Sequence, residues 1–493
     1  MAKKTAFFLY STVLQILFVC ASAAHVHLST LRDGSLQKRT FAGRAVNKKG
    51  RFASLFGEAN FMRVALLAIA LTMASFTAEA RVRIYLDEGN TAPLPIALIP
   101  FDGPDSEMDE MGEKMRKVIM NNLNNSGLFE VIKKKAYLQD NASLVREGPK
   151  FSEWKLIKAE GLVMGSVVEE NEKVTVEFRL MDVYGEKQLS GRRYSADKQF
   201  WRHLAHRVSD DIYSTMTGEK GYFATRVVHI SEQKRANEII KKLCVMDQDG
   251  ENYQCLTDGN HLVLTPRFSP EAQQLIYMSY ENGRPRLYFL DLPTGKQTIV
   301  GDYEGLNSSP RFSPDGKSIV MTLTKGHEGN AEIYSMNLRS KKLKRLTNQR
   351  GIDTSPDFSP DGKQIVFNSD RGGKAALYIM KKNGKGVRRL TFGDGRYYAP
   401  VWSPRGDLIA FVKEYKGRFG IGVIDVDGKE ERMLTDSFLD ESPTWSPNGR
   451  VIAFARQKGD VTKMYTIDLT GHNERQMPTP LNASDPAWSP LLH

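Results

Sequence analysis

The sequence predicts a multidomain chain: a small N-terminal α/β domain followed by a six-bladed β-propeller. A five-residue motif, Pro-x-Phe/Trp-Ser-Pro, occurs six times at spacings of 44, 46, 44, 43 and 43 residues. Each interval holds the signals of four short strands, the content of one propeller blade. The segment before the motifs has no repeat and mixes helical and strand patterns. The six motifs begin at Pro266, Pro310, Pro356, Pro400, Pro443 and Pro486.

One repeat illustrates the expected order of strands. The motif strand ending at Phe358 leads into a Pro-Asp-Gly turn at 360–362, in which Pro fixes φ and Gly adopts a positive φ. The apolar runs 364–367 and 377–380 predict the second and third strands. An Asn-Gly turn then leads to a fourth strand that ends in Leu390-Thr391. We expect the motif aromatic to pack between blades.

The two ends of the repeat predict how the propeller closes. The sixth motif is followed by only three residues, so its blade lacks three strands. Three strands without a motif precede the first copy, at Phe223–Ile230, Lys242–Asp247 and Asn252–Thr257. Pairing the C-terminal strand with these N-terminal strands would remove exposed sheet edges. We therefore expect the propeller, residues 222–493, to be closed in this way.

Residues 81–217 are expected to form the α/β domain, joined to the propeller by a short linker at 217–221. Alternating or apolar runs predict strands at 81–86, 95–101, 173–182 and 188–194. Helical spacing of apolar residues predicts a helix capped by Ser106 and stopped at Gly127. Further helices are expected at 151–160 and 199–216.

Two segments near the start have the pattern of secretory signal peptides: a short basic region, an apolar core and small residues, at 3–24 and 62–80. Neither core reaches the ~18–20 residues of a spanning helix, so the chain is expected to be exported and not membrane-embedded. We interpret 62–80 as the signal peptide, cleaved between Ala80 and Arg81, and 1–61 as a spurious or leader extension. The alternative is a genuine first leader with a second segment that stays near the membrane.

Charge and cysteine content restrict the function further. Of the net charge of +11, residues 1–61 contribute nine basic and two acidic residues, so the remainder is only mildly basic. No basic stripe interleaved with aromatic residues occurs, so nucleic-acid binding is not expected. Cys244 and Cys255 lie symmetrically about the turn dipeptide Asp249-Gly250 and would face each other across two strands. A disulfide and two free thiols both fit this spacing.

Sequence patterns for catalysis or cofactor binding were not found. There is no Gly-x-Ser-x-Gly, no phosphate-binding loop, no dinucleotide glycine fingerprint and no His-Glu-x-x-His. His203 and His206 lie three apart on a predicted helix without an evident third ligand, which favours packing or surface histidines. The segments 247–250 and 425–428 resemble calcium-loop fragments but lack the downstream Glu, which favours turns. We expect no cofactor, no metal and no enzymatic activity.

Several carboxylates precede the motifs and are expected to converge near one mouth of the propeller channel. A protein-binding rim is the preferred interpretation, and a bound cation is the alternative. They are Asp353, Asp440, Glu441 and Asp485.

These features together resemble the TolB family, the periplasmic propellers of the Tol–Pal envelope system. The resemblance covers 81–493 and rests on Val82-Arg83-Ile84, the joining stretch 217–221, the repeated Phe-Ser-Pro-Asp-Gly, the run 438–443 and the terminal motif 486–490. It implies a non-enzymatic periplasmic scaffold. Such a scaffold links the inner-membrane protein TolA to the outer-membrane peptidoglycan-associated lipoprotein, Pal, and supports outer-membrane invagination in cell division and envelope integrity.

The resemblance also implies two contact regions. Pal would dock on the loops before the motif strands, where Thr354 aligns with a family threonine and Leu306 stands where some relatives have histidine. TolA would bind the mature N-terminal segment 81–89, which begins Arg81, Val82, Arg83, Ile84 and is implicated in coupling the two regions. The implied Pal-contact residues are Leu306, Asn307, Ser308, Ser309, Asp353, Thr354, Ser355, Tyr397, Tyr398, Leu439, Asp440, Glu441, Ser442 and Asp485.

Two other function classes compete with a protein-binding scaffold. The first is an enzyme with paired carboxylates of raised pKa in the propeller channel. The second is a peptidoglycan- or carbohydrate-binding propeller, in which Tyr397, Tyr398 and Phe438 near one mouth would stack on sugars.

Overall fold

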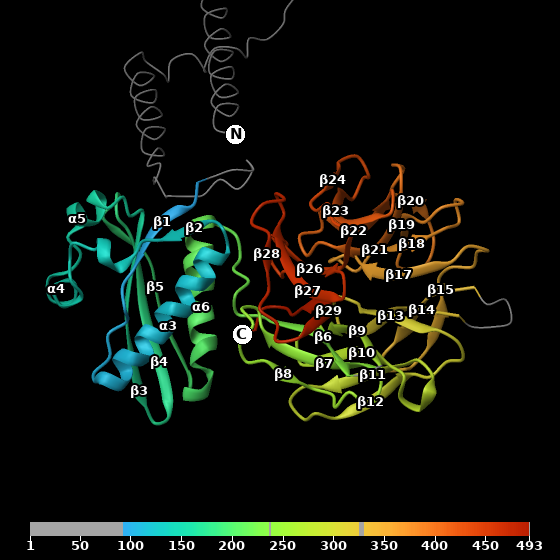
Figure 1. Cartoon of the computed structure of the whole chain (residues 1–493), viewed down its shortest axis with the longest axis horizontal. Helices are drawn as coiled ribbons and strands as arrows, with labels where there is room; N and C mark the ends of the chain where they lie inside the picture. Colours follow the sequence, from blue (N-terminus) through green and yellow to red (C-terminus); the bar gives the residue numbers. More distant parts are fainter. Residues whose placement is uncertain (1–91, 236–237, 325–329, 493) are drawn as a thin grey trace, which may run out of the picture. The chain divides into compact units, whose positions relative to one another are not determined.

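The computed structural model describes residues 92–235, 238–324 and 330–492 (Figure 1). The expectations for 1–61, for the signal peptide 62–80, for cleavage between Ala80 and Arg81, and for the segment 81–89 lie outside the described residues. Everything described belongs to one compact unit that begins at Ala80. Within this part of the chain, no helix is both long enough and apolar enough to cross a membrane.

Residues 94–217 form the expected α/β domain, a five-stranded sheet in the order β2-β1-β3-β4-β5. Strand β1 is parallel to β2 and β3, and the remaining pairs are antiparallel. Helices α3 and α6 pack on one face of the sheet, and α4 and α5 pack on the other. The bounds are β1 (Leu94–Leu98), α3 (Ser106–Asn125), β2 (Phe129–Val131), α4 (Asn141–Glu147), α5 (Phe151–Leu156), β3 (Gly161–Glu170), β4 (Lys173–Asp182), β5 (Lys187–Asp197) and α6 (Trp201–Thr217).

Some details of this domain differ from expectation. The cap of α3 is Asp105, not Ser106, because the Asp105 carboxylate accepts the Met108 N–H at 2.9 Å. Helix α5 ends at Leu156 instead of reaching 160, since Lys158 adopts a positive φ of 59°. Strand β3 and helix α4 had no counterpart in the prediction. In β3, Gly165 permits a backbone approach that a side chain would block, since a Cβ there would lie 2.3 Å from the Glu177 carbonyl oxygen.

A β-propeller-like region follows, built mainly of four-stranded antiparallel sheets. Two of its four-strand groups, β21–β24 and β25–β28, are joined into one sheet by the single pair Phe419↔Leu439. The bounds of the first three groups are β9 (Val263–Phe268), β10 (Gln274–Ser279), β11 (Arg286–Asp291), β12 (Gln297–Gly301); β13 (Asn307–Phe312), β14 (Ser318–Leu323), β15 (Glu332–Asn337), β16 (Leu343–Arg345); β17 (Asp353–Phe358), β18 (Gln364–Ser369), β19 (Ala376–Lys381) and β20 (Arg388–Arg389). Those of the last three are β21 (Arg396–Trp402), β22 (Leu408–Tyr415), β23 (Arg418–Asp425), β24 (Glu431–Met433); β25 (Leu439–Trp445), β26 (Val451–Lys458), β27 (Val461–Asp468), β28 (Arg475–Gln476); and β29 (Asn482–Trp488), β6 (Arg226–Arg235), β7 (Glu238–Asp247), β8 (Gln254–Cys255).

The last strand of the chain pairs with the first strand of this region. Strand β29 runs antiparallel to β6, with Trp488 opposite Val227. Strand β6 begins at Arg226 and not at Phe223, because the N–H groups of Phe223 and Ala224 donate to the Asp210 carboxylate at 2.7 and 3.0 Å. The sheet β29-β6-β7-β8 therefore joins segments from the two ends of the repeat region.

Hydrogen bonds explain why the repeated residues recur. The motif serine accepts the N–H at the start of the second strand, as Ser359 Oγ does from Gln364 at 2.9 Å. The threonine of the Leu-Thr pair accepts an N–H of the third strand, as Thr391 Oγ1 does from Leu377 at 3.0 Å. The same bonds join Gln274 to Ser269, Ser318 to Ser313, Val451 to Ser446, Leu243 to Thr257, Ile333 to Thr347 and Ile421 to Thr435.

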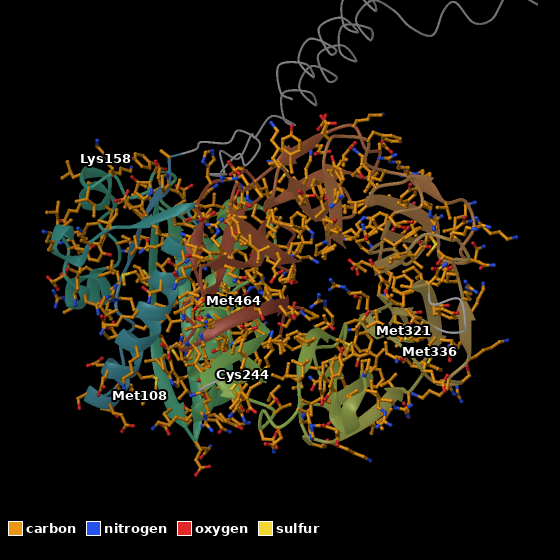
Figure 2. All side chains as sticks on the ribbon, turned by 45° about the vertical axis from the view of Figure 1, so that its right-hand side comes forward. Met108, Lys158, Cys244, Met321, Met336 and Met464 are labelled. Carbon is orange, nitrogen blue, oxygen red and sulfur yellow. A yellow bond between two sulfur atoms is a disulfide. The ribbon has the colours of Figure 1, made fainter. Side chains whose placement is uncertain are left out.

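Apolar cores form between neighbouring sheets. Phe312 of one motif stacks on Phe289 of the preceding sheet, with ring centroids 5.6 Å apart, as expected for the motif aromatic. Met321 and Met336 belong to the same core and lie near each other in Figure 2. A separate core is shared by the two domains, because Trp488 of β29 packs in one cluster with Tyr213 of α6.

Candidate functional site

The predicted partner contacts lie where the motif strands begin. We call these six strands, β9, β13, β17, β21, β25 and β29, the inner strands, and each lies against the next. Because every repeat has the same strand order, the first residues of the inner strands share one end of the region, the strand-start face. The turns after the motifs and the turns between third and fourth strands share the opposite end, the turn face.

The strand-start face carries exposed apolar side chains at two adjacent positions of the repeat, four or five residues before the motif proline. Leu262, Ile352, Phe438 and Leu481 each directly precede an inner strand, and they are 39%, 51%, 69% and 40% exposed. Leu306, half-buried, has the same position before β13. Single exposed apolar residues are ordinary, but their recurrence where the inner strands begin gathers them on one face, a surface suited to a protein partner.

The implied Pal-contact residues divide into two groups. The side chains of Asn307, Asp353, Tyr397 and Asp440 are fully buried and face the interior of the sheets, so this structure corrects their expected placement on the surface. The others are half-buried or exposed at the strand-start face: Leu306, Ser308, Ser309, Thr354, Ser355, Tyr398, Leu439, Glu441, Ser442 and Asp485.

Two of the four carboxylates expected at the channel mouth are instead locked in ion pairs. Asp353 accepts from Arg371 at 2.6 Å, and Asp440 accepts from Arg456 at 2.6 and 2.7 Å. Arg456 also pairs with Glu474. These carboxylates hold neighbouring strands together, since a buried charge is tolerated only when it is paired.

The other two carboxylates do lie near each other. Ser442 Oγ donates to Asp485 Oδ1 at 2.9 Å, linking two neighbouring inner strands. Partial burial, and then the charge of Asp485, raise the pKa of Glu441. This end of the region is therefore acidic between β25 and β29.

A backbone irregularity explains which residues turn inward. The residue before the motif proline has a positive φ in every copy, and all six inner strands shift register beside it. Such a bulge changes the alternation of faces along a strand. The side chain three residues before the motif proline therefore points into the protein interior and not toward solvent. The positive-φ residues are Thr265, Ser309, Ser355, Ala399, Ser442 and Asp485.

The α/β domain and its linker contact the turn face. Its bonds reach two turns that follow inner strands and two turns that separate third and fourth strands, and so leave the strand-start face uncovered among the described residues. They join Glu219 to Arg405 at 3.2 Å, the Lys220 carbonyl to Asn448 at 2.8 Å, the Asn125 carbonyl to Asn473 at 2.9 Å, and Arg202 to Asp249 at 2.5 Å.

The remaining sequence patterns are also placed. Cys244 and Cys255, on paired strands β7 and β8, are joined by a disulfide (Cys244 is labelled in Figure 2). Asp425 accepts the N–H groups of Lys429 and Glu430, which is the turn interpretation of 425–428. His206, however, meets Asp247 and Asp249, an arrangement that no local spacing in the sequence indicates.

Comparison with known proteins identifies the family. The TolB amino-terminal domain model matches residues 82–189, and the TolB beta propeller domain model matches residues 213–492. The chain belongs to the TolB family. The resemblance drawn from the motifs is thereby confirmed.

Individual TolB proteins are similar over different lengths. The Tol-Pal system protein TolB of Paramagnetospirillum magneticum is 49% identical over 243 residues, 49% of this chain and 54% of that protein, so the chain spans about half the length of this curated relative. A crystal structure of TolB from Acinetobacter baumannii is 30% identical, covers 81% of this chain and 97% of its own, and superimposes with a TM-score of 0.74. A putative TolB from Agrobacterium tumefaciens is 22% identical, covers 53% and 91%, and has a TM-score of 0.44, too low to support an argument.

Proposed function

We propose that this chain is a periplasmic, non-enzymatic scaffold of the Tol–Pal system. In this role it links the inner-membrane protein TolA to the outer-membrane lipoprotein Pal and supports outer-membrane invagination and envelope integrity. Membership of the TolB family supports the proposal, together with the name Tol-Pal system protein of a relative that is 49% identical. The segment beginning Arg81, Val82, Arg83, Ile84 is proposed to bind TolA.

The propeller is proposed to have six blades in a closed ring, residues 222–493, after a domain at 81–217. The inner strands support this, because each lies against the next and β29 also lies against β9. The motif bond supports it too: Ser489 Oγ accepts the Arg226 N–H at 2.9 Å, the same serine bond made within the other repeats. Residues 62–80 remain the proposed signal peptide, after an extension at 1–61.

The apolar positions on the uncovered strand-start face carry the proposal of a Pal-type partner. A protein partner would bury these side chains at the centre of its contact and meet the hydroxyl and acidic groups around them, the arrangement typical of interfaces. The proposed surface keeps the half-buried and exposed residues given above and adds Leu262, Ile352, Phe438 and Leu481.

Calorimetric titration with the soluble domain of the organism's Pal-like lipoprotein tests this surface. Phe438→Ser should weaken binding at least tenfold, because losing a desolvated aromatic anchor costs about 2 kcal/mol or more. Thr354→Arg should weaken it by adding bulk and charge. Val387→Ser, a loss of an exposed apolar side chain on the turn face, is the matched control. Binding unchanged by Phe438→Ser and Thr354→Arg would contradict the surface.

The carbohydrate-binding alternative loses one of its three aromatic residues. Tyr397 is fully buried, and its hydroxyl donates to Glu431 at 2.8 Å. Phe438 stays exposed and Tyr398 is half-buried, which leaves a poor stacking platform. If the parent chain is retained on protein-free sacculi and Phe438→Ser is not, the carbohydrate-binding interpretation would be favoured over the scaffold.

A further inference from the structure

Two patterns that are unspecific in the sequence meet between α6 and the β7–β8 turn. His206, Asp247 and Asp249 each offer one ligand atom, and these atoms lie within 4.8 Å of one another. His206 Nε2 is 3.8 Å from Asp247 Oδ2 and 3.8 Å from Asp249 Oδ2. One imidazole and two carboxylates are a donor set that suits Zn²⁺ and related divalent transition metals.

The imidazole provides an independent observation that points to a ligand. His206 is only 2% exposed, and its Nε2 has no hydrogen-bond partner among the described residues. Two atoms bound at 2.0–2.1 Å to a tetrahedral metal are about 3.4 Å apart. The two imidazole–carboxylate distances of 3.8 Å would therefore shorten by roughly 0.4 Å, and the two carboxylate oxygens, which lie within 4.8 Å of each other, would also move closer together. We propose that His206, Asp247 and Asp249 bind a divalent transition metal of the Zn²⁺ class where the two domains meet.

The surroundings of His206 include an outer partner of the kind that metal-bound histidines have. Its Nδ1 lies 2.9 Å from the Asn122 amide, which also contacts Ser209 at 2.9 Å and Gln248 at 2.8 Å. A metal on Nε2 places the ring proton on Nδ1, and Asn122 then has to present its amide oxygen. Gln248 can accommodate this by turning its own amide, and Ser209 by turning its hydroxyl from the Ala205 carbonyl toward Asn122, so the network has a metal-compatible arrangement.

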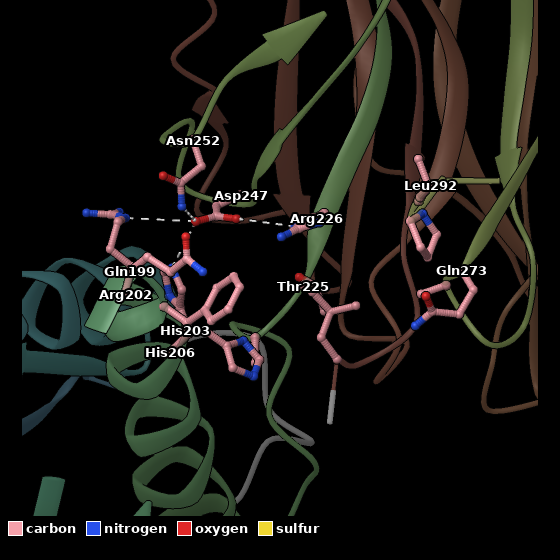
Figure 3. Close-up of a pocket in the computed structure, with 15 residues that line it drawn as sticks. Gln199, Arg202, His203, His206, Thr225, Arg226, Asp247, Asn252, Gln273 and Leu292 are labelled. Atoms are coloured by element: carbon pink, nitrogen blue, oxygen red, sulfur yellow. Dashed lines mark hydrogen bonds and ion pairs between the residues drawn. The ribbon is translucent and has the colours of Figure 1, made fainter. Parts of the chain in front are cut away.

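A cavity of about 470 Å³ is lined by two of the three ligands, His206 and Asp247. Its lining includes His203, His206, Arg226 and Asp247, and Figure 3 shows these side chains around the opening. The cavity supplies an entry path and room for water in an open coordination position. Three protein ligands with an open position are typical of accessible zinc sites.

Arginine side chains neutralise the carboxylates in the structure described. Arg202 lies 2.5 Å from Asp249 and 3.8 Å from Asp247, and Arg226 lies 3.8 Å from Asp247. The metal must therefore displace Arg202, whose guanidinium stands 5.5 Å from the Trp201 ring centroid. The metal ion therefore competes with the Arg202 guanidinium for the two carboxylates. The affinity of the site for the metal should rise when Arg202 is replaced by an uncharged residue.

Titration of the metal-free mature chain proposed above, residues 81–493, with Zn²⁺ tests the site; the cysteines of this form are those of the disulfide. We expect one strong site per chain. His206→Asn keeps a polar group for Asn122 but removes Nε2, and Asp249→Asn removes one carboxylate; each should weaken Zn²⁺ binding at least about 100-fold, beyond the 10–100-fold typical of outer-partner loss. Arg202→Gln should bind more tightly, and His472→Asn, which removes an exposed histidine elsewhere, should bind as the parent does.

X-ray absorption of the loaded protein should show nitrogen and oxygen ligands and no sulfur. The proposal fails if the parent chain does not bind Zn²⁺, if His206→Asn and Asp249→Asn bind as the parent does, or if only Arg202→Gln binds, since Arg202 would then permanently replace the metal. The site lies on the turn face, so Pal titrations report on the strand-start face separately.

Discussion

At the scale of single residues, a buried imidazole ties stability to pH. His229 on β6 is fully buried, and this burial lowers its pKa to about 4. A histidine in the unfolded chain has a pKa of about 6.5. Between pH 6.5 and about pH 4, His229 is therefore protonated in the unfolded chain and neutral in the folded chain. The stability linked to His229 is therefore fully present above about pH 6.5 and is lost as pH falls toward 4.

We predict that His229→Leu flattens this pH dependence. The parent chain should lose up to about 3 kcal/mol between pH 7 and 4 through this group, and the variant should not. Urea unfolding midpoints at a series of pH values measure the difference. Val387→Ser, at an exposed position without an ionisable group, should keep the parental slope. An identical slope in His229→Leu would contradict the assignment.

Residue roles that repeat were predictable, and roles that depend on a bulge or a distant segment were not. The motif serines and threonines recur because each makes the same local bond. Asp353 and Asp440 occur at equally regular positions, yet the bulge beside the motif proline turns them into ion pairs. His206 meets Asp247 only through the packing of α6 on the β7–β8 turn, which no spacing encodes.

At the scale of elements, the Leu-Thr pair fixes the third and fourth strands of a blade. Thr391 is fully buried, and its Oγ1 accepts the Leu377 N–H. Thr391→Val keeps the shape but leaves that N–H without a partner, which should cost about 1–3 kcal/mol of unfolding free energy. Thr391→Ser keeps the acceptor and loses only a methyl group, about 1 kcal/mol. Denaturant unfolding should rank Val below Ser; the reverse order would show that packing outweighs the bond.

Elements with clean periodicity were predicted best. Strand β4 has the predicted bounds, because its apolar and polar residues alternate along Lys173–Asp182. Strand β3 was missed, since two glycines and a run of apolar residues hide its alternation, and one of its partner strands, β1, lies far earlier in the sequence. Helix ends depended on side-chain geometry that spacing does not determine, as the Asp105 cap of α3 shows.

At the scale of the whole molecule, one tryptophan connects the two domains. Trp488 of β29 donates its Nε1–H to Thr225 Oγ1 at 2.8 Å and packs edge-on against Tyr222, with centroids 5.8 Å apart. The same cluster contains Tyr213 and Met216 of α6. Damage to the last strand should therefore spread to the α/β domain.

We predict that Trp488→Ala destabilises the chain by about 3–5 kcal/mol and speeds amide hydrogen exchange in α6. Trp402→Ala removes the corresponding motif aromatic from β21, whose core contains no residue of the α/β domain. It should be comparably destabilising without speeding exchange in α6. Equal protection of α6 in both variants would contradict the shared core. The pairing of β29 with β6 could be predicted by counting the strands in each repeat. The core shared by Trp488 and α6 could not, because the sequence does not show which turns of the propeller the α/β domain covers.

The bond between Arg226 and Ser489 spans 263 residues of chain, and that separation sets the order of events during biosynthesis. Strand β6 leaves the ribosome long before its partner β29 has been synthesised. During this time, the backbone N–H and C=O groups of β6 that later pair with β29 have no partner strand. Forming so distant a contact is slow, and an open edge invites association with other chains. The nascent protein should depend on chaperones that hold it in an unaggregated state until strand β29 has been synthesised, and a ribosome stalled just before that strand would yield an aggregation-prone product.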